Sequence, residues 1–164
     1  MFFIHSCLKS LNKVLEIKSR PLTEGEKNLA QSVFGESLQL TNIQIVAHRA
    51  ILKDYAMSPN GHIYFNIQNW SDDFSACSLA KQSWLIHELT HVWQIQQGLA
   101  VLRNALFNRK YSYVLEQGKL FLSYGIEQQA QMVQDYFIRR ELGQDCQAYV
   151  ACIPFLLSSA PSDL

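Results

Sequence analysis

His87-Glu88-Leu89-Thr90-His91 is the stretch that best indicates both the fold and the chemistry of this chain. On a helix, two residues four positions apart lie on the same face, one turn apart, so both imidazoles can reach one small cation. Glu88 lies beside them and can reach a water molecule on that cation. Two histidine ligands with a neighbouring carboxylate are the arrangement used for metal-assisted hydrolysis. The pattern therefore predicts a metal site that activates water.

The sequence around this motif predicts a buried helix. Ser75 or Ser78 can cap its start, and Gly98 can end it after Gln97. Apolar side chains lie on nearly all of its sides, at Trp84, Leu85, Ile86, Leu89, Val92, Trp93 and Ile95. Such a helix is buried, and its histidines and glutamate need partners because an unpaired buried charge is costly. A metal ion is one such partner; hydrogen bonds from core histidines to carbonyl groups are the structural alternative.

The third metal ligand has to come from elsewhere, because a catalytic zinc ion usually has three protein ligands and one further position for water. No histidine follows His91, which leaves carboxylates as candidates: Glu116, Glu127, Asp135, Glu141 and Asp145. Glu127 is favoured, since apolar residues at helical spacing from Ile126 to Phe137 predict a helix that can pack antiparallel to the motif helix. An acidic residue in the first turn of a helix is also favourable without a metal.

The motif and its surroundings resemble known proteins. HELTH followed by a glutamate on a second helix resembles the gluzincin group of zinc metallopeptidases, which includes thermolysin. The chain is similar in more detail to small bacterial Rhs-element or Vgr-related peptidases. The stretches that carry this similarity are Leu22–Glu26, Pro59–Phe65, His87–Gln94 and Tyr124–Ala130. The resemblance implies a zincin-like domain that binds Zn²⁺ through His87, His91 and Glu127 and hydrolyses peptide bonds with Glu88 as general base.

The chain departs from the gluzincin pattern in one place. Many gluzincins have an aspartate four residues after the ligand glutamate, where it orients a metal-binding histidine, but this chain has Gln131 there. Asp135, Gln128 or Gln129 could orient the histidines instead. An oxyanion donor is also needed, and its candidates are Tyr124, Tyr113 and His62. Residues 63–67 could offer a strand edge to an extended peptide.

The remaining sequence predicts a mainly helical α+β fold with a small antiparallel sheet beside the motif helix. Residues 1–20 have the apolar spacing of an amphipathic helix, and Thr23-Glu24-Gly25-Glu26 is a capping box that opens a second helix ending at Gly35. Alternation predicts strands near 43–47 and 62–67. Residues 111–115 could be extended, and 158–164 reads as a flexible tail.

Composition limits the classes of function. With 164 residues, 48% hydrophobic and 17% charged, the chain is expected to form a single globular domain over 1–164. Its net charge is zero and it has no basic run, so a nucleic-acid partner is not expected. No membrane span or signal peptide is recognisable, which predicts a cytoplasmic protein unless a specialised secretion system exports it. Cys7, Cys77, Cys146 and Cys152 form no Cys-x-x-Cys pair and are expected to be free thiols.

Two other classes of function compete with a peptidase that acts on peptides or proteins. The first is a non-catalytic zinc-binding domain that serves as an interaction or assembly module with partner proteins of a bacterial secretion system. The second is a di-iron bundle, because Glu88-Leu89-Thr90-His91 is also a Glu-x-x-His motif. A di-iron site needs a second such motif on another helix, and the sequence has none.

Overall fold

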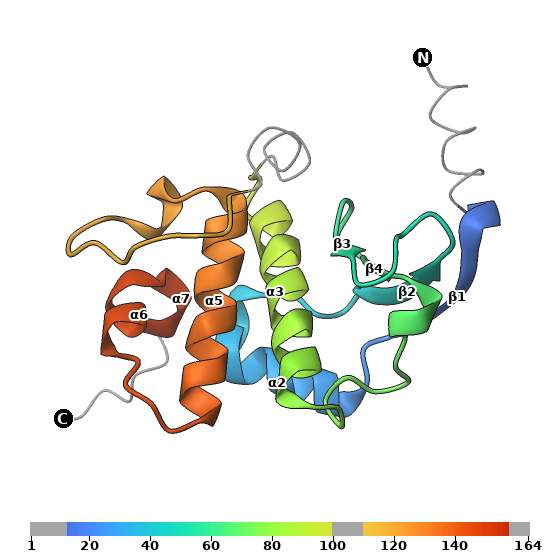
Figure 1. Cartoon of the computed structure of the whole chain (residues 1–164), viewed down its shortest axis with the longest axis horizontal. Helices are drawn as coiled ribbons and strands as arrows, with labels where there is room; N and C mark the ends of the chain where they lie inside the picture. Colours follow the sequence, from blue (N-terminus) through green and yellow to red (C-terminus); the bar gives the residue numbers. More distant parts are fainter. Residues whose placement is uncertain (1–12, 100–109, 158–164) are drawn as a thin grey trace, which may run out of the picture.

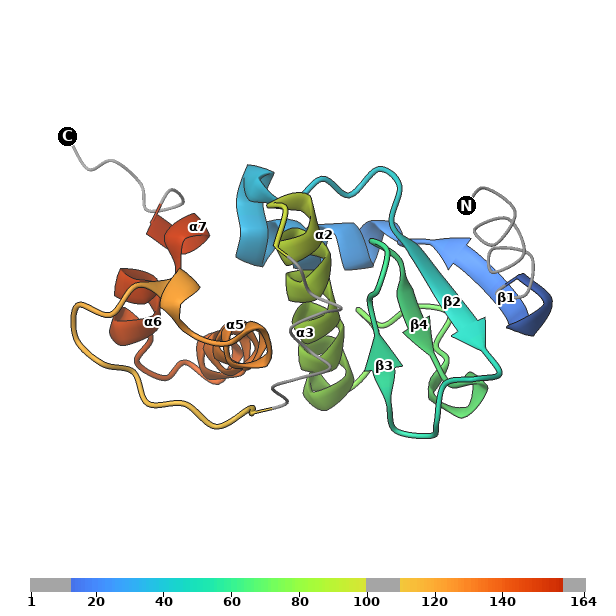
Figure 2. The same cartoon turned by 90° about the horizontal axis from the view of Figure 1, so that it is seen from above.

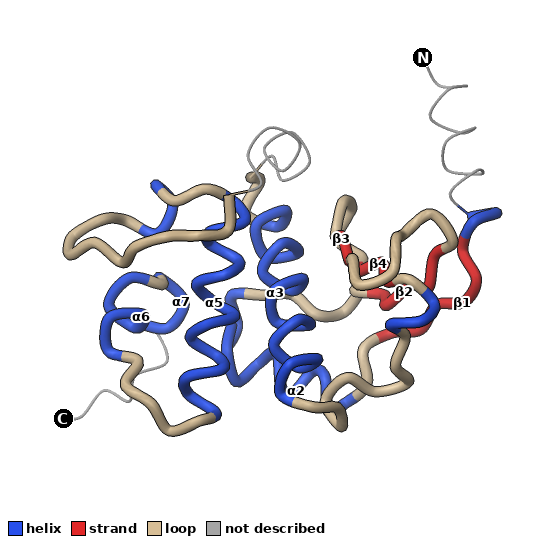
Figure 3. The backbone as a smooth tube through the Cα atoms, viewed as in Figure 1, coloured by secondary structure: helices blue, strands red, loops and turns tan. Residues whose placement is uncertain are grey.

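The computed structural model describes residues 13–99 and 110–157, in which helices and strands lie on opposite sides of the molecule (Figure 3). The helices are α2 (Glu24–Phe34), α3 (Leu79–Gln96), α5 (Ile126–Glu141), α6 (Gln147–Cys152) and α7 (Pro154–Leu157). The strands are β1 (Glu16–Pro21), β2 (Gln44–His48), β3 (Ala56–Met57) and β4 (Ile63–Phe65). Short 3-10 turns lie at Gly35–Ser37, Ile67–Asn69 and Phe121–Ser123. The predicted combination of several helices with a small sheet is confirmed.

The strands form a four-stranded sheet in the order β1-β2-β4-β3 (Figure 1, Figure 2). β1 and β2 are antiparallel, β2 and β4 are parallel, and β3 and β4 are antiparallel. The prediction of an antiparallel sheet is therefore wrong for the central pair. The chain passes from β2 to the edge strand β3 and returns as β4 between them, so β2 and β4 run the same way. Alternating side chains identified both strands but carry no information on strand direction.

The end of the expected N-terminal helix is a strand. Residues 13–15 are helical, but Glu16–Pro21 is the edge strand β1, which pairs with β2 and sets Ser19 opposite Val46. The predicted helix over 1–20 is thus wrong for residues 16–20, while residues 1–12 and the predicted tail 158–164 lie outside the described residues. Most β1 side chains are exposed. The spacing of the apolar residues in this segment therefore does not predict its secondary structure, which is determined by hydrogen bonding to β2.

The capping box predicted for the second helix is present. Thr23 Oγ1 accepts a hydrogen bond from the Glu26 N–H at 3.1 Å, and Glu26 Oε2 accepts one from the Thr23 N–H at 2.9 Å. The helix ends at Gly35, where the backbone has a φ of 52° that favours glycine. Glu26 is also bound by Arg20 of β1 through two hydrogen bonds. This pair fixes the start of α2 to the edge of the sheet.

The motif helix α3 lies between the sheet and α5 (Figure 2). Every residue from Leu85 to Gln94 is buried, as its apolar circumference predicts. Ser78 is its N-cap, and Gly98, with a φ of 76°, follows its last residues. α5 packs along α3 in the antiparallel direction (Figure 1), and both helices contribute to one hydrophobic core. This packing brings the start of α5 to the C-terminal half of α3.

Other expectations concern the loops and the cysteines. Residues 111–115 form neither helix nor strand in the described chain. Cys77, Cys146 and Cys152 are free thiols, whereas Cys7 lies outside the described residues. Among the helices of the described chain, none combines the length and the apolar character needed to cross a membrane.

Candidate metal centre

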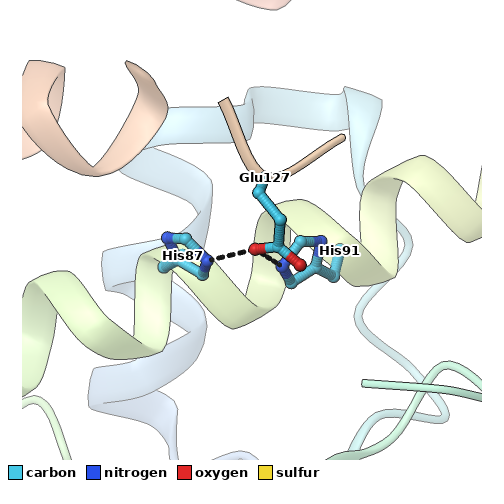
Figure 4. Close-up of side chains that lie close together, drawn as sticks. All are labelled: His87, His91 and Glu127. Carbon is cyan, nitrogen blue, oxygen red and sulfur yellow. Dashed lines mark ion pairs between the residues drawn. The ribbon is translucent and has the colours of Figure 1, made fainter. Parts of the chain in front are cut away.

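Two histidines from α3 and one glutamate from α5 meet where these helices pack (Figure 4). His87 and His91 lie one turn apart on α3, and Glu127 is in the first turn of α5. Glu127 Oε2 lies 3.4 Å from His87 Nε2 and 3.3 Å from His91 Nε2. All three side chains are buried. The structure therefore brings together the three residues that the sequence predicts as metal ligands.

The spacing of these atoms suits a tetrahedral metal ion. Two ligand atoms that bind tetrahedral zinc at about 2.0–2.1 Å stand about 3.3 Å apart. The two distances to Glu127, 3.4 and 3.3 Å, agree with that separation. The ligand atoms of all three residues lie within 4.8 Å of one another. Two imidazole nitrogens and a carboxylate oxygen are donors that zinc accepts, so the residues present fit this ion and leave one tetrahedral position for another ligand.

Glutamine side chains orient both imidazole rings. His87 Nδ1 lies 3.0 Å from Gln134 Oε1, and His91 Nδ1 lies 2.8 Å from Gln94 Oε1. An amide oxygen only accepts hydrogen bonds, so in a neutral ring the proton belongs on Nδ1 and the Nε2 lone pair faces Glu127. The rings are therefore held in the tautomer that binds a metal through Nε2.

The orienting residues expected from the sequence lie elsewhere. Gln131 donates to Asp135 Oδ1, and Gln128 accepts a hydrogen bond from the Gly125 N–H. Gln129 contacts Gln94 rather than a ligand histidine, because its Oε1 accepts a hydrogen bond from Gln94 Nε2 at 2.9 Å. The prediction that Asp135, Gln128 or Gln129 contacts a ligand histidine is therefore wrong in this structure.

Two of the ligand candidates, Glu127 and His91, have shifted pKa values. Burial by itself raises the pKa of Glu127, but hydrogen bonds from His87 and His91 and their positive charge lower it to about 2. Burial lowers the pKa of His91, but the hydrogen bond to Glu127 and the charges of Glu88 and Glu127 outweigh it and raise the pKa above the usual value. Without a metal, this cluster thus favours an ionised carboxylate beside a protonated His91. A metal cation replaces that proton.

Glu88 is held by a residue outside the motif. Its Oε2 accepts a hydrogen bond from Ser58 Oγ at 2.9 Å, and both side chains are buried. Ser58 follows β3 directly, so the edge of the sheet and the motif helix together position this carboxylate. No spacing rule links residue 58 to residue 88, so this contact is not predictable from the sequence pattern.

Glu88 and the ligand candidates line one cavity of about 330 Å³. Five of the residues around this cavity are polar, and we call them its polar lining: Ser58, His87, Glu88, His91 and Glu127. The volume lies at the lower end of the range for ligand pockets. A small molecule or a short piece of an extended chain can therefore reach the predicted base and the predicted ligands from the same side.

Comparison with known proteins supports a relationship to secretion-system proteins. No family model matches the chain. The type VI secretion system spike protein VgrG2b of Pseudomonas aeruginosa (strain PAO1) is 42% identical over an alignment of 138 residues, and the match covers 76% of this chain and 14% of the spike protein. The effector domain of P. aeruginosa VgrG2b has a similar structure, with a TM-score of 0.71, 39% identity and coverage of 82% of both chains. This chain belongs to the VgrG2b effector-domain family.

The family relationship concerns one domain of a much longer protein. This VgrG2b-family chain spans 14% of the length of the spike protein that it matches, but most of the solved effector domain. The sequence-based expectation of a Vgr-related protein is therefore confirmed.

Two candidate oxyanion donors of this VgrG2b-family domain do not line the cavity. Tyr124 Oη donates to the Val114 carbonyl at 3.0 Å and accepts from the Glu116 N–H at 3.1 Å, so it holds the loop before α5. His62 has a buried Nδ1 without a hydrogen-bond partner among the described residues. Neither residue belongs to the cavity lining. The structure gives no support to either as an oxyanion donor.

The other candidates from the sequence are also engaged elsewhere in the domain. Tyr113 Oη donates to Asp135 and contacts Tyr149. Glu116 pairs with Lys119, and Glu141 pairs with Arg140. Asp145 accepts a hydrogen bond from the Gln147 N–H. None of these carboxylates joins the three-residue cluster found in the described part of the chain.

The positions of Gln94 and Gln134 near the ligand histidines could be predicted from helical spacing. Gln94 follows His91 by three residues, which places it one helical turn further on the same face. Gln134 follows Glu127 by seven residues, two turns along the face that meets α3. A search for hydrogen-bonding side chains at these spacings finds both.

Proposed function

We propose that this chain is a type VI secretion effector domain that hydrolyses peptide bonds with a zinc ion bound by His87, His91 and Glu127. The observation that carries the proposal is the shared cavity, in which the predicted ligands and Glu88 lie together. A structural zinc site is usually closed by four protein ligands and needs no free carboxylate beside them. Three ligands with a carboxylate in the same cavity are the arrangement of a hydrolytic site.

The ligand residues prepare the site before any substrate arrives. Gln134 and Gln94 hold the two rings with Nε2 toward Glu127, so little rearrangement is needed for binding. A zinc ion bound there supplies a Lewis acid that activates water and polarises a carbonyl group. Its charge also offsets the carboxylate of Glu127, which stays ionised because its pKa is about 2.

Glu88 is the general base in this proposal. Ser58 occupies Oε2, and we assign Oε1 to the proton taken from the attacking water. The same carboxyl group then gives this proton to the nitrogen of the leaving amine, so the proton count is balanced over the reaction. Burial of Glu88 and Ser58 keeps the carboxylate in one orientation toward the cavity.

The peptide has a strand beside which it can bind. The sequence favoured residues 63–67 as this edge, but β4 lies between β2 and β3 and is paired on both sides. β3 is the edge strand instead, and its residues Ala56 and Met57 line the cavity. An extended peptide can add to such an edge through backbone hydrogen bonds.

The place of this domain in a larger system is part of the proposal. The spike protein that it matches is named for type VI secretion, and the solved structure is named as the effector domain of VgrG2b. We infer that this chain is likewise exported by such a system, together with partner proteins of that system. The motif helix beside a small sheet, with the third ligand on a following helix, also supports kinship with the zincins.

A test of hydrolysis compares zinc-loaded wild type with Glu88→Gln on a broad peptide and protein library. The substitution keeps the size of the side chain and removes the base, so we expect turnover to fall about 10²–10⁴-fold. Zinc content should be unchanged, since Glu88 is not among the three clustered ligands. Equal rates in the two proteins, with full zinc occupancy, would contradict the proposal.

A second candidate is a non-catalytic zinc-binding module that assembles with secretion proteins. It is favoured by the match to a spike protein, whose name describes a part of the secretion system rather than an enzyme. In that case zinc would stabilise the packing of α3 on α5 without any turnover. Absence of hydrolysis across the whole library, with one zinc per chain, would select this candidate.

A further inference from the structure

The remainder of the cavity lining is chemically uniform. Outside the polar lining, every described residue that lines the cavity is apolar or aromatic. The largest of these side chains form what we call the apolar wall: Ile51, Leu52, Tyr55, Met57 and Tyr111. Hydrolysis at a metal site does not require such a wall. Its composition therefore has to reflect what the cavity binds.

Four of the five side chains of the apolar wall are exposed, and only Ile51 is buried. Leu52 is 70% exposed, Tyr55 58%, Tyr111 47% and Met57 44%. Large apolar residues scattered singly on a surface need no explanation, but a group of them around one concave site marks a binding site. These side chains remain in contact with water until a ligand covers them.

The wall is contributed by two different parts of the fold. Leu52, Tyr55 and Met57 come from the loop after β2 and from β3, whereas Tyr111 comes from the segment that precedes α5. The Tyr111 ring lies 6.2 Å from the His87 ring, between centroids. Gln128 Nε2 of α5 donates to the Ser112 carbonyl at 2.6 Å and so ties down the segment next to Tyr111. A ligand beside the metal-binding histidines therefore meets apolar surface from both parts.

We propose that the cavity selects peptides with a large apolar or aromatic side chain next to the cleaved bond. This inference rests on the proposed function and adds the substrate class to it. The side chain replaces water on the apolar wall, while the peptide backbone lies along β3 with its carbonyl group at the polar lining.

The same lining disfavours a charged substrate side chain next to the cleaved bond. Its histidines and carboxylates are His87, Glu88, His91 and Glu127, and they are engaged with one another, with Ser58 or with glutamines. The apolar wall holds no charged group that could form an ion pair with an acidic or a basic side chain, and its polar side-chain atoms are the hydroxyl groups of Tyr55 and Tyr111. A charge placed there would lose its hydration without gaining an oppositely charged partner.

The test uses binding, so that it is independent of turnover. The probes are peptide hydroxamates, which bind zinc through the hydroxamate group and differ only in the neighbouring side chain: isobutyl, benzyl, methyl, carboxymethyl or aminobutyl. Their affinities are measured by calorimetry on zinc-loaded Glu88→Gln. Burial of a leucine-sized or phenylalanine-sized side chain should make the isobutyl and benzyl probes about 10–100-fold tighter than the methyl probe. The two charged probes should bind more weakly than the methyl probe.

Variants show whether the wall is responsible for this preference. In Leu52→Ala/Met57→Ala the advantage of the isobutyl probe should fall by about 10-fold or more. The matched control is Leu120→Ala/Leu122→Ala, which removes two leucines that are 76% and 60% exposed and do not line the cavity. This control should keep the full preference, and both double variants should fold because the replaced side chains are on the surface.

Several results would overturn the proposed preference for apolar side chains. Equal affinity for all side chains, tighter binding of a charged probe, or an unchanged preference in Leu52→Ala/Met57→Ala overturns the inference. The proposed function would survive any of these results if zinc-loaded wild type still cleaves peptides. Loss of all hydroxamate binding in a protein with one zinc per chain also overturns the inference, and turnover by the wild type then decides the proposed function separately.

Discussion

Two buried carboxylates in the first turn of two helices have contrasting surroundings in this fold. Glu26 of α2 accepts four hydrogen bonds, two on each oxygen: from Arg20 Nη2 and the Phe74 N–H on Oε1, and from Arg20 Nη1 and the Thr23 N–H on Oε2. Glu127 of α5 faces two imidazoles with one oxygen and lines a cavity. Glu26 is completely buried, whereas Glu127 retains some access to solvent.

The difference shows how to distinguish a structural carboxylate from a functional one. Every lone pair of Glu26 has a fixed donor from the protein, so no ligand can compete for it. Glu127 meets groups that are themselves candidate metal ligands, and a metal ion can replace the proton that they share. Helix position and burial are similar in both cases. The identity of the partners and the presence of a cavity separate them.

Removing the structural carboxylate should have the largest effect on stability. Glu26→Ala leaves the Arg20 guanidinium and two backbone N–H groups without their acceptor, and breaking a buried ion pair typically costs about 3–5 kcal/mol. Urea unfolding measures this change. The matched control is Glu24→Ala on the same helical turn, where the side chain is exposed and the loss should stay within about 1 kcal/mol. Similar losses in both variants would show that Glu26 is not a structural anchor.

Removing the functional carboxylate should instead weaken metal binding. Glu127→Ala deletes one of three ligands, so zinc affinity should fall by more than about 10-fold, as loss of even an outer partner costs about 10–100-fold. Competition with a chelator measures it. Glu116→Ala and Glu141→Ala are controls, because their carboxylates pair with Lys119 and Arg140 away from the cluster. Unchanged zinc affinity in Glu127→Ala, or a loss of zinc affinity in Glu116→Ala, would show that Glu127 is not the metal ligand that this contrast with Glu26 requires.

The orienting glutamines offer a finer test. Gln134→Leu removes the acceptor on His87 Nδ1 and should lower zinc affinity about 10-fold, at the small end of the range for outer partners. Gln131→Leu is the matched control one turn earlier on α5, since Gln131 contacts Asp135 and no ligand histidine. If Gln131→Leu weakens zinc binding more than Gln134→Leu, the assignment of the orienting residues is wrong.

The smallest expected effect is a dependence of zinc affinity on pH. The pKa of His91 is raised, so this ring keeps its proton at and somewhat above its ordinary pKa, and zinc must displace the proton. Affinity should therefore fall as the pH decreases through that region, by at most about 10-fold per pH unit for each displaced proton. Glu127 contributes nothing there because its pKa is about 2. Chelator competition between pH 5.5 and 8 measures the slope, and constant affinity over this range would contradict the shared-proton account.

The sequence predicted most of what is encoded locally. The His87, Glu88 and His91 spacing, the burial of α3 and the capping box at Thr23 and Glu26 all depend on residues within one or two helical turns. Glu127 was reached from the absence of later histidines and from the apolar face of its helix. The structure brings it to both imidazoles.

The errors concern pairings over longer distances. The parallel arrangement of β2 and β4 and the conversion of Glu16–Pro21 into a strand depend on which strands meet, and side-chain alternation does not specify this. The hydrogen bond between Ser58 and Glu88 joins residues 30 positions apart. Tyr124 is a candidate oxyanion donor from the sequence, but its hydroxyl binds the backbone of residues 114 and 116.

The most direct test of the central claim is a zinc-edge anomalous difference map from crystals of the zinc-loaded protein. The account predicts one strong peak per chain, about 2.0–2.2 Å from His87 Nε2, His91 Nε2 and a carboxylate oxygen of Glu127, with Glu88 outside the ligand sphere. A map without a peak at the cluster would contradict the account. A peak whose ligand sphere is completed by Glu88 or by another carboxylate in place of Glu127 would contradict it as well.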